Sequence, residues 1–228
     1  ALTTTRQGGC SHPPYAGLNL ASHVGDDPAA VAANRNRLTA ELGLPAEPLW
    51  LTQVHGCEVA DARLAKPGCQ ADAAIASTPG EICAVLTADC LPVLFCDRSG
   101  TRVAAAHAGW RGLAAGVLET TLERLALPPG ELLAWLGPSI GPQAFEVGDE
   151  VVAAFVAEDP GAMAGFRQAT ADRWQADLYW LARRRLLAQG VRQVSGGDWC
   201  TFSDPERFYS YRRDGVTGRM ASLIWLLD

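Results

Sequence analysis

The spacing of hydrophobic residues changes along the chain, and this change predicts where helices and strands lie. The first third is rich in glycine, proline and polar residues and predicts mainly loops, interrupted by a helix at roughly 28–42. Asp27 and Pro28 are typical of a helix start, and Gly43 is typical of a helix end. The apolar run LWLTQV then predicts a strand at 49–54.

The central part consists of apolar, β-prone runs separated by short turns. The runs at 82–88 and 92–97 predict strands, and the segment DRSGT predicts a turn into a third strand at 101–108. Leucine and valine then recur at helical spacing. This spacing predicts one continuous helix that begins near 109–111 and ends at about Leu125.

The last third continues to alternate between strand and helix patterns. A buried strand is predicted within 131–140, helices at about 149–157 and 176–189, and strands at 191–195 and 221–227. Strands that alternate with helices, with some hairpins between them, are typical of a mixed sheet covered by helices. The expected fold class is therefore α/β with mixed sheets.

Composition places this chain among globular proteins. Hydrophobic residues make up 48% of the 228 residues and charged residues 19%, so the chain can bury a large core and is not intrinsically disordered. No repeat of fixed period and no low-complexity linker divides the sequence. We expect one domain over residues 1–228.

Charge limits the partners that the chain can bind. The formal net charge is −6 and no long block of Lys or Arg is present, which argues against a nucleic-acid partner. The one basic cluster, Arg183-Arg184-Arg185, lies in a helical stretch, and we interpret it as a solvated helix face rather than a phosphate-binding patch. Small molecules are the expected partners, and no obligate protein partner is inferred.

Three features predict a cytoplasmic protein. No apolar run approaches the roughly 18 residues that span a bilayer, so no membrane segment is expected. The start ALTTTRQGGC lacks the charged and apolar regions of a secretory signal. The seven cysteines form no CxxC pair, which argues against a disulfide scaffold and for a reducing compartment.

Two histidines and one cysteine lie where the chain changes character. His55 follows the predicted strand at 49–54, and His107 ends the strand-like run VAAA. Cys90 follows AVLTAD and precedes Leu91-Pro92, which we expect to interrupt regular structure. Side chains at strand ends often reach a crevice rather than a packed core.

Two imidazoles and one thiolate suit zinc. Three protein ligands leave the fourth tetrahedral position for water or substrate, as in catalytic zinc sites. The metal would hold the thiol as a thiolate and lower the pKa of bound water. The spacing of the three residues matches no short metal motif, however. From the residues alone, a buried structural Cys90 with hydrogen-bonded loop histidines at 55 and 107 remains an open alternative.

The segment from His107 to Gly112 predicts a second feature. It reads as a strand end, a glycine-containing turn and the first turn of a helix. A helix N-terminus presents unpaired N–H groups that favour an anion such as phosphate, and Arg111 would add a guanidinium. The alternative is a simple tight turn with Arg111 in solvent.

Long stretches of the sequence resemble the bacterial YfiH-like laccase-domain family, whose members are named multicopper polyphenol oxidases or purine nucleoside phosphorylases. The resemblance covers essentially the whole chain, and several of the matching blocks exceed ten residues. These blocks are TTRQGGCSHPPYAGLNLASHVGDD (4–27), NRNRL (34–38), LTQVHG (51–56), TADCLPVLFC (87–96), AAAHAGWRGL (104–113), AWLGPSIGPQAFEVGDEV (134–151) and FYSYRRDGVTGRMASLIWL (208–226). One departure is Cys10, where the family more often has valine.

The resemblance implies a fold, a metal site and a set of activities. The family's metal ligands fall on His55, Cys90 and His107. The implied fold is a layered α/β/β/α arrangement related to the deamidating domain of cytotoxic necrotizing factors. The implied activities are phosphorolysis of adenosine, inosine, guanosine and methylthioadenosine and deamination of adenosine. Polyphenol oxidation and editing of peptidoglycan precursors are also associated with the family.

The number of histidines argues against a multicopper oxidase. Such an enzyme needs about ten histidines in paired HxH motifs by the family expectation, whereas this chain has four and no HxH. Zinc is therefore the expected cofactor. Copper remains possible at the same site, because it binds a given set of ligands more tightly than zinc.

Nucleoside chemistry also needs carboxylates and an anion site. Asp72 and Asp89 are the candidate carboxylates for moving protons, although each also fits a turn or a cap. Arg6 is expected to help Arg111 bind phosphate.

Polar residues of the segment LNLASH are candidates for substrate binding. Asn19 and His23 are expected to line the pocket, and hydrogen bonding within the loop is the alternative for both.

Two other readings use the same residues. Without metal, Cys90 activated by His107 would be the nucleophile of an amidase or hydrolase acting on a peptidoglycan precursor or a similar amide. A zinc-stabilised binding protein is the non-catalytic alternative.

Overall fold

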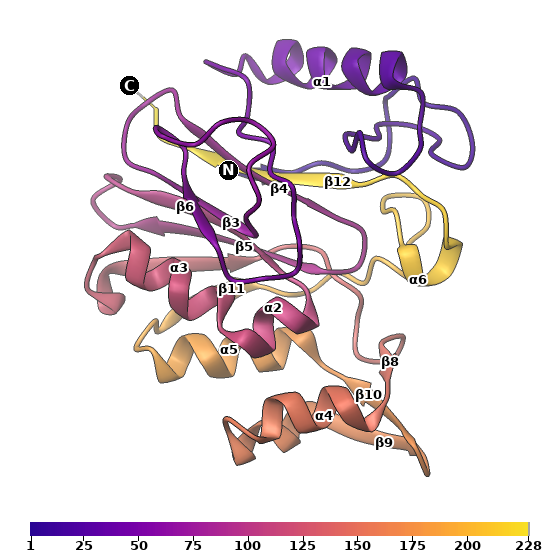
Figure 1. The fold of residues 1–228 in the computed structure, drawn as a ribbon, viewed down its shortest axis with the longest axis vertical. Helices are drawn as coiled ribbons and strands as arrows, with labels where there is room; N and C mark the ends of the chain where they lie inside the picture. Colours follow the sequence, from indigo (N-terminus) through magenta and orange to yellow (C-terminus); the bar gives the residue numbers. More distant parts are fainter. Residues whose placement is uncertain (228) are drawn as a thin grey trace.

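Two β-sheets lie face to face in the computed structural model, which describes residues 1–227 (Figure 1). The larger sheet contains, in spatial order, β11 (Gln193–Gly196), β7 (Leu132–Leu136), β5 (Leu91–Asp97), β6 (Val103–Ala108), β3 (Ala73–Ala76) and β2 (Val59–Asp61). The smaller contains β1 (Leu2–Thr3), β12 (Met220–Trp225) and β4 (Ile82–Thr87). β5 pairs antiparallel with β6, whereas β7 pairs parallel with β11, so the larger sheet is mixed.

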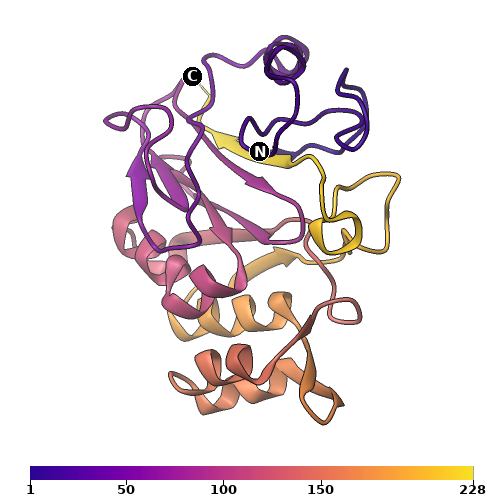
Figure 2. The same ribbon diagram turned by 45° about the vertical axis from the view of Figure 1, so that its right-hand side comes forward.

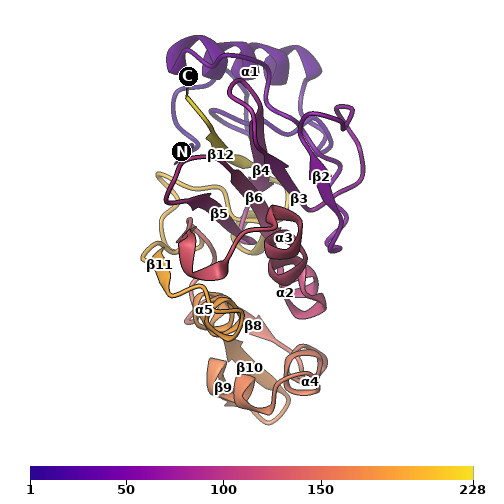
Figure 3. The same cartoon turned by 90° about the vertical axis from the view of Figure 1, so that its left-hand side faces the viewer.

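Helices cover the outer faces of both sheets. α1 (Pro28–Leu42) lies over the smaller sheet, and α2 (Trp110–Ala115), α3 (Val117–Leu125) and α5 (Leu178–Ala188) lie beneath the larger one (Figures 1 and 3). This gives the expected α/β/β/α layers. A peripheral unit below α5 contains α4 (Asp149–Val156), η2 (Pro160–Gly165) and a small sheet of β8 (Glu146–Val147), β10 (Arg173–Ala176) and β9 (Phe166–Thr170) (Figure 2). The remaining short helices are η1 (Pro129–Glu131) and α6 (Tyr211–Asp214).

Alternation of side chains along each strand builds a separate core between each pair of layers. In β4, Cys83 and Val85 pack between the two sheets, whereas Ile82, Ala84 and Leu86 pack toward α1. A strand buried on both faces needs apolar residues at every position, which explains the run ICAVLT. In β6 the odd-numbered residues face the space between the sheets and the even-numbered ones face the helices.

The structure confirms most of the predicted elements and overturns two. The helix at 28–42 forms as predicted, with Asp27 capping its start and Gly43 in the left-handed conformation at its end. The strand predicted at 49–54 is wrong, because this segment makes only isolated bridges at Leu49 and Thr52.

The single helix predicted to end at Leu125 is also wrong. Gly116, at a φ of 99°, ends α2 and begins α3. Glycine adopts this backbone conformation without the steric cost of a Cβ atom, so the apolar spacing continues across a break in the helix.

Leu91-Pro92 does not interrupt regular structure as expected. β5 begins at Leu91, and Pro92 is paired in register with His107 of β6. Pairing of β5 with β7 begins only at Val93. Pro92 therefore lies at the start of the strand, where a missing N–H group is tolerated.

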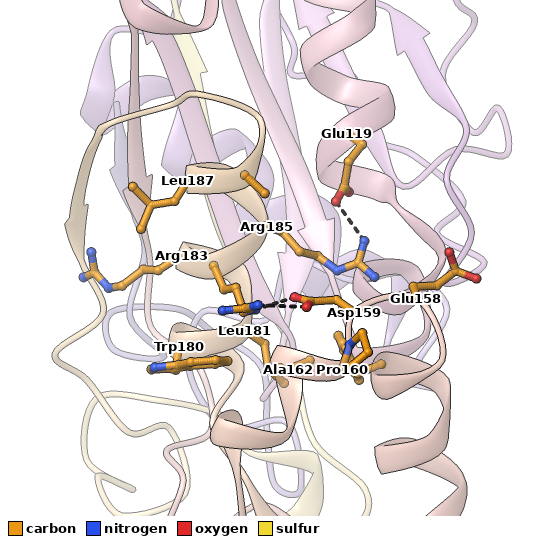
Figure 4. Close-up of a pocket in the computed structure, with 13 residues that line it drawn as sticks. Glu119, Glu158, Asp159, Pro160, Ala162, Trp180, Leu181, Arg183, Arg185 and Leu187 are labelled. Carbon is orange, nitrogen blue, oxygen red and sulfur yellow. Dashed lines mark hydrogen bonds and ion pairs between the residues drawn. The ribbon is translucent and has the colours of Figure 1, made fainter.

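The arginine cluster of α5 is not the solvated face that the sequence suggested. Arg183 donates to the carbonyl oxygens of Val194 and Gly196, and both other arginines form ion pairs (Figure 4). All three side chains are half-buried. Within residues 1–227, no helix combines the length and the apolarity needed to cross a bilayer.

Candidate metal centre

Three side chains that are distant in sequence meet at one end of the two central sheets. His55 lies in the loop before β2, Cys90 lies between β4 and β5, and His107 lies in β6. One ligand atom from each lies within 4.8 Å of the others. The Sγ atom of Cys90 is 3.9 Å from Nε2 of His55, and the two imidazole rings lie edge to face with centroids 4.8 Å apart.

Strand register places two of these residues. His107 is an odd-numbered residue of β6, and the odd-numbered Val103 and Ala105 face the space between the two sheets. Leu91 pairs with Ala108, so the chain enters β5 beside the end of β6 and Cys90 comes next to His107. The crevice at the strand ends therefore follows from the antiparallel pairing of β5 and β6.

Asp72 holds both histidines in place. Its carboxylate is fully buried and accepts hydrogen bonds from the main-chain N–H groups of Val54, His55 and Gly56 at 2.7–3.1 Å. Its Oδ1 atom lies 2.8 Å from Nδ1 of His107. A carboxylate that accepts from one ring nitrogen fixes the tautomer and leaves Nε2 free to bind a metal. Burial would raise the pKa of Asp72, but these hydrogen bonds lower it.

The backbone at His55 is held in an uncommon conformation. Its φ is 62°, in the left-handed region that a non-glycine residue seldom adopts. The three consecutive N–H groups bound by Asp72 compensate for this strain. The loop thereby turns the imidazole of residue 55 toward Cys90.

Two glycines at the start of α2 allow the close packing of the site. A Cβ atom on Gly109 would lie 2.9 Å from Sγ of Cys90 and 3.0 Å from Cδ2 of His55. A Cβ atom on Gly112 would lie 2.9 Å from the carbonyl oxygen of Gly56. The two glycines of the sequence AHAGWRG therefore allow α2 to pack closely against Cys90 and the loop at His55. Its N-terminal anion site remains untested, and α2 is only six residues long.

The electrostatics favour a thiolate beside an imidazolium in the absence of metal. Burial would raise the pKa of the Cys90 thiol, but the charge of His107 and hydrogen bonds from His107 and His55 outweigh burial and lower it. The pKa of His107 is raised, because the Cys90 thiolate and Asp72 outweigh the opposite effect of burial. A thiolate is the form of cysteine that binds metals and attacks electrophiles.

The donor set fits one small cation. Two imidazole nitrogens and a thiolate are the ligands that zinc prefers, at about 2.0–2.1 and 2.3 Å. In such a tetrahedron the ligand atoms lie roughly 3.3–3.7 Å apart. The observed limit of 4.8 Å therefore requires a contraction on the order of 1 Å to bring all three onto one ion. Within residues 1–227, no other group of three such residues converges in this way.

Asp89, the other candidate carboxylate, stabilises neighbouring loops. It is buried and accepts hydrogen bonds from the hydroxyl groups of Thr201 and Ser210 and from the main-chain N–H of Arg212. Its φ is 95°. Its side chain thus links the turn before Cys90 to the segment that contains α6.

The structure places the four candidate substrate-binding residues differently from one another. Asn19 is fully buried and bonds to its own loop and to the main chain of Arg219, so it does not line a pocket. Arg6 donates to the carbonyl oxygen of Pro205 and stacks on Tyr209. Arg111 is exposed and stacks on Trp110, and His23 is exposed.

A small hollow beside Cys90 was missed by the sequence reasoning. It has a volume of about 130 Å³ and is lined by Ala88, Asp89, Cys90, Trp110, Ile140, Phe145, Leu178, Tyr211 and Arg212. Three of these side chains are aromatic, and Tyr211 is 60% exposed. All three aromatic residues lie in blocks that carry the family resemblance, which was the only available signal. A planar ring fits such a lining.

Comparisons with known proteins agree over nearly the whole chain. Residues 1–227 match the family described as multi-copper polyphenol oxidoreductase laccase. A purine nucleoside phosphorylase of Pseudomonas aeruginosa, PA4543, is 58% identical over 100% of this chain and 93% of its own length. The purine nucleoside phosphorylase YfiH of Escherichia coli is 57% identical, with the same coverage.

Solved structures show the same fold. The Neisseria meningitidis protein NMB0706 superposes with a TM-score of 0.96 at 52% identity, covering 99% of this chain and 93% of that protein. YlmD of Geobacillus stearothermophilus superposes with a TM-score of 0.93 at 31% identity, covering 99% of this chain and 91% of YlmD. The mixed α/β class and the expected resemblance are thereby confirmed.

Proposed function

The chain belongs to the multi-copper polyphenol oxidoreductase laccase family, and from this premise we propose that it is a zinc-dependent purine nucleoside phosphorylase. The single observation that carries the proposal is the convergence of His55, Cys90 and His107 with Asp72 behind them. The proposed substrates are adenosine, inosine, guanosine and methylthioadenosine with inorganic phosphate. We further propose deamination of adenosine as a second activity of the same site.

The roles of the metal and its ligands follow from the donor set. When bound, zinc would supply a Lewis acid with one open position. Copper would fit the same nitrogen and sulfur atoms, but a single group of three ligands does not hold the several copper ions of a multicopper oxidase. We therefore propose nucleoside chemistry over polyphenol oxidation.

Phosphorolysis exchanges one bond to the sugar for another. An oxygen of phosphate forms a bond to C1′ while the bond from C1′ to the purine nitrogen breaks. The electron pair of that bond goes to the purine, which leaves after it takes up one proton. In this scheme Trp110, Phe145 and Tyr211 bind the base, and water is excluded from the apolar part of the hollow.

The two buried carboxylates act indirectly in the proposed reaction. Asp72 is enclosed and bound to His107, and Asp89 already accepts three hydrogen bonds. We therefore propose both as positioning residues rather than as groups that exchange protons with substrate. Arg111, exposed on α2, is proposed as an outer contact to the phosphate, whereas the contacts of Arg6 support a structural role.

The direct test is phosphate-dependent release of adenine from adenosine by the purified protein with zinc bound. The proposal expects release to require both phosphate and metal, to stop on chelation and to return when zinc is restored. Adenine release that is independent of phosphate, at confirmed zinc occupancy, would contradict it.

A second candidate rests on the lowered pKa of Cys90. A thiolate beside a protonated His107 is also the arrangement of a cysteine hydrolase. Such an enzyme would cleave amides such as peptidoglycan precursors without metal. Activity that resists chelation but is lost on alkylation of Cys90 would favour this reading over the metal-dependent one.

A further inference from the structure

Arg219 stands out because most of its hydrogen-bonding capacity is unused. Its Nη1 atom donates to the carbonyl oxygens of Thr217 and Gly218 at 2.8 and 3.0 Å. Within residues 1–227, no acceptor is bound to its Nε or Nη2 and no carboxylate forms an ion pair with it. Buried or half-buried guanidinium groups normally have their charge compensated. Within the described residues, Arg219 therefore has no ion-pair partner, and one edge of its guanidinium is free.

A neighbouring arginine shows the contrast. Arg213 belongs to the same segment, and its Nε, Nη1 and Nη2 atoms all donate to carbonyl oxygens or to Asp214. The segment can thus saturate an arginine where the fold requires it. The edge left free on Arg219, formed by Nε and Nη2, is the edge that binds an oxyanion through two parallel hydrogen bonds.

One side-chain contact and one main-chain contact fix the position of Arg219. Its guanidinium lies over the ring of Tyr211, 5.8 Å from the centroid, and Tyr211 lines the hollow that contains Cys90. Its main-chain N–H donates to the buried amide oxygen of Asn19 at 3.0 Å. Burial lowers the pKa of Arg219, and the charges of Cys90 and Asp89 oppose this effect. The contact with Tyr211 therefore places the guanidinium beside a residue that lines the hollow containing Cys90.

His23 belongs to the loop that runs beside Arg219, because the main-chain N–H of Leu20 donates to the carbonyl oxygen of Arg219 at 3.4 Å. Although the side chain of His23 is exposed, partial burial of its imidazole and the charges of Arg219 and Arg35 lower its pKa. Arg35 is itself fixed by the carbonyl oxygen of Leu20 and by stacking on Trp50. An anion bound between Arg219 and His23 would relieve this repulsion.

We infer that Arg219, with His23 as a second donor, binds the inorganic phosphate beside the metal centre. The inference rests on the proposed phosphorolysis and names its co-substrate subsite. Asn19, which is buried, positions the main chain of Arg219 without touching phosphate. In this assignment the inner phosphate contact comes from the segment 208–226, and Arg111 contributes only from outside.

The test compares initial rates of adenine release against phosphate concentration for five zinc-loaded proteins. These are the wild type and the variants Arg219→Gln, Arg219→Lys, His23→Gln and Arg124→Gln. Loss of a charge-assisted pair of hydrogen bonds predicts a rise in the KM for phosphate of about tenfold or more for Arg219→Gln, with the KM for adenosine within about twofold. Arg219→Lys recovers part of this loss, and His23→Gln raises the KM about threefold. Arg124 is exposed on α3, and its variant behaves as wild type.

Several outcomes overturn the inference. They are an unchanged KM for phosphate in Arg219→Gln at normal zinc content and melting temperature, or an equal rise in the KM for adenosine. If Arg219→Gln does not fold, the KM for phosphate is compared in Arg219→Lys and His23→Gln instead. An unchanged KM for phosphate in both variants overturns the inference.

Calorimetric titration with phosphate alone separates this inference from the proposed function. Phosphate binding that is lost in Arg219→Gln, in a protein without phosphate-dependent adenine release, supports the subsite and contradicts phosphorolysis. Phosphate-dependent release with an unchanged KM in the variant supports phosphorolysis and overturns the subsite.

Discussion

A large open cavity beside α5 and the metal centre differ in whether their charged side chains form ion pairs. The cavity, between α3, α5 and the end of α4, has a volume of about 810 Å³ (Figure 4). In it Arg184 is bound to Asp159 and Arg185 to Glu119. The hollow beside Cys90 has only about 130 Å³, yet its lining includes Cys90, whose thiol has a lowered pKa, and Tyr211, on whose ring the guanidinium of Arg219 lies.

The comparison shows that cavity volume alone does not indicate chemistry. In the large cavity, the opposite charges of each ion pair compensate one another. A charged ligand there would have to compete with these existing contacts. At the metal centre, the backbone of His55 is held in the left-handed region, and within residues 1–227 no carboxylate forms an ion pair with Arg219. Groups that remain unsatisfied at the end of folding are the ones available to a substrate.

The largest effect is expected from a substitution that removes the sulfur ligand of the metal centre. Cys90→Ala is predicted to weaken zinc binding and adenine release by at least about a hundredfold, because even outer-sphere partners of metal ligands contribute 10–100-fold. Arg184→Gln, in the large cavity, is predicted to change the rate by no more than about twofold. Metal content and initial rates of both variants measure the contrast, and equal losses in the two would refute it.

The second-largest effect is the difference in zinc affinity expected between variants of two buried aspartates, Asp72 and Asp97. Asp72→Asn is predicted to lower zinc affinity about 10–100-fold, because the amide no longer fixes the tautomer of His107 with a negative charge. Asp97 is the matched control, since it is also buried and accepts hydrogen bonds from the main chain of Thr101 and Arg102.

Asp97→Asn is expected to reduce the free energy of unfolding by about 1–3 kcal/mol without changing zinc affinity. Chelator competition and denaturant unfolding measure the two quantities. Weaker zinc binding in Asp97→Asn than in Asp72→Asn would remove the special role of Asp72.

A smaller effect is expected from adding one methyl group. Gly109→Ala places a Cβ atom 2.9 Å from Sγ of Cys90, and the ligand must shift. A misplacement of this size predicts a loss of activity of about tenfold at unchanged secondary structure. Gly130→Ala is the control, because nothing lies within 4 Å of its added Cβ atom. Wild-type activity in Gly109→Ala would show that the site is looser than the structure indicates.

The smallest effect concerns acid stability at the large cavity. The hydrogen bond from Arg184 lowers the pKa of Asp159, so the pair stabilises the fold above the unfolded pKa and is lost as pH falls through the folded value. Both side chains are partly exposed, which keeps the contribution small. The melting temperatures of wild type and Asp159→Asn should therefore differ slightly at pH 7 and converge as the pH falls below the usual aspartate pKa of about 3.9. A difference that grows on acidification would reverse the assigned sign.

The sequence predicted the regular elements better than the site. Patterns in which every residue is apolar, such as ICAVLT and VAAAHA, identified the strands buried on both faces. The break between α2 and α3 at Gly116 could not be predicted from the sequence, because the apolar spacing continues across it. The segment 49–54 has a strand-like composition but finds only isolated partners.

At the site, strand ends indicated Cys90 and His107, whereas the strand expected before His55 does not form and only the family resemblance supports that ligand. The supporting residues could not be proposed in this way. The sequence indicates Asp72 as a candidate carboxylate, but its burial behind His107 depends on contacts between residues far apart in sequence. Arg219 looked like any other basic residue, since an absence of partners is a property of the folded chain alone.

X-ray absorption spectroscopy of the zinc-loaded protein tests the central claim most directly. The account predicts one zinc ion per chain, bound by a single sulfur at about 2.3 Å and two imidazole nitrogens at about 2.0–2.1 Å, with a light fourth ligand from outside the chain. Loss of the sulfur signal in Cys90→Ser would identify its source. A spectrum without sulfur in the wild type, or with four protein ligands and no open position, would contradict the account.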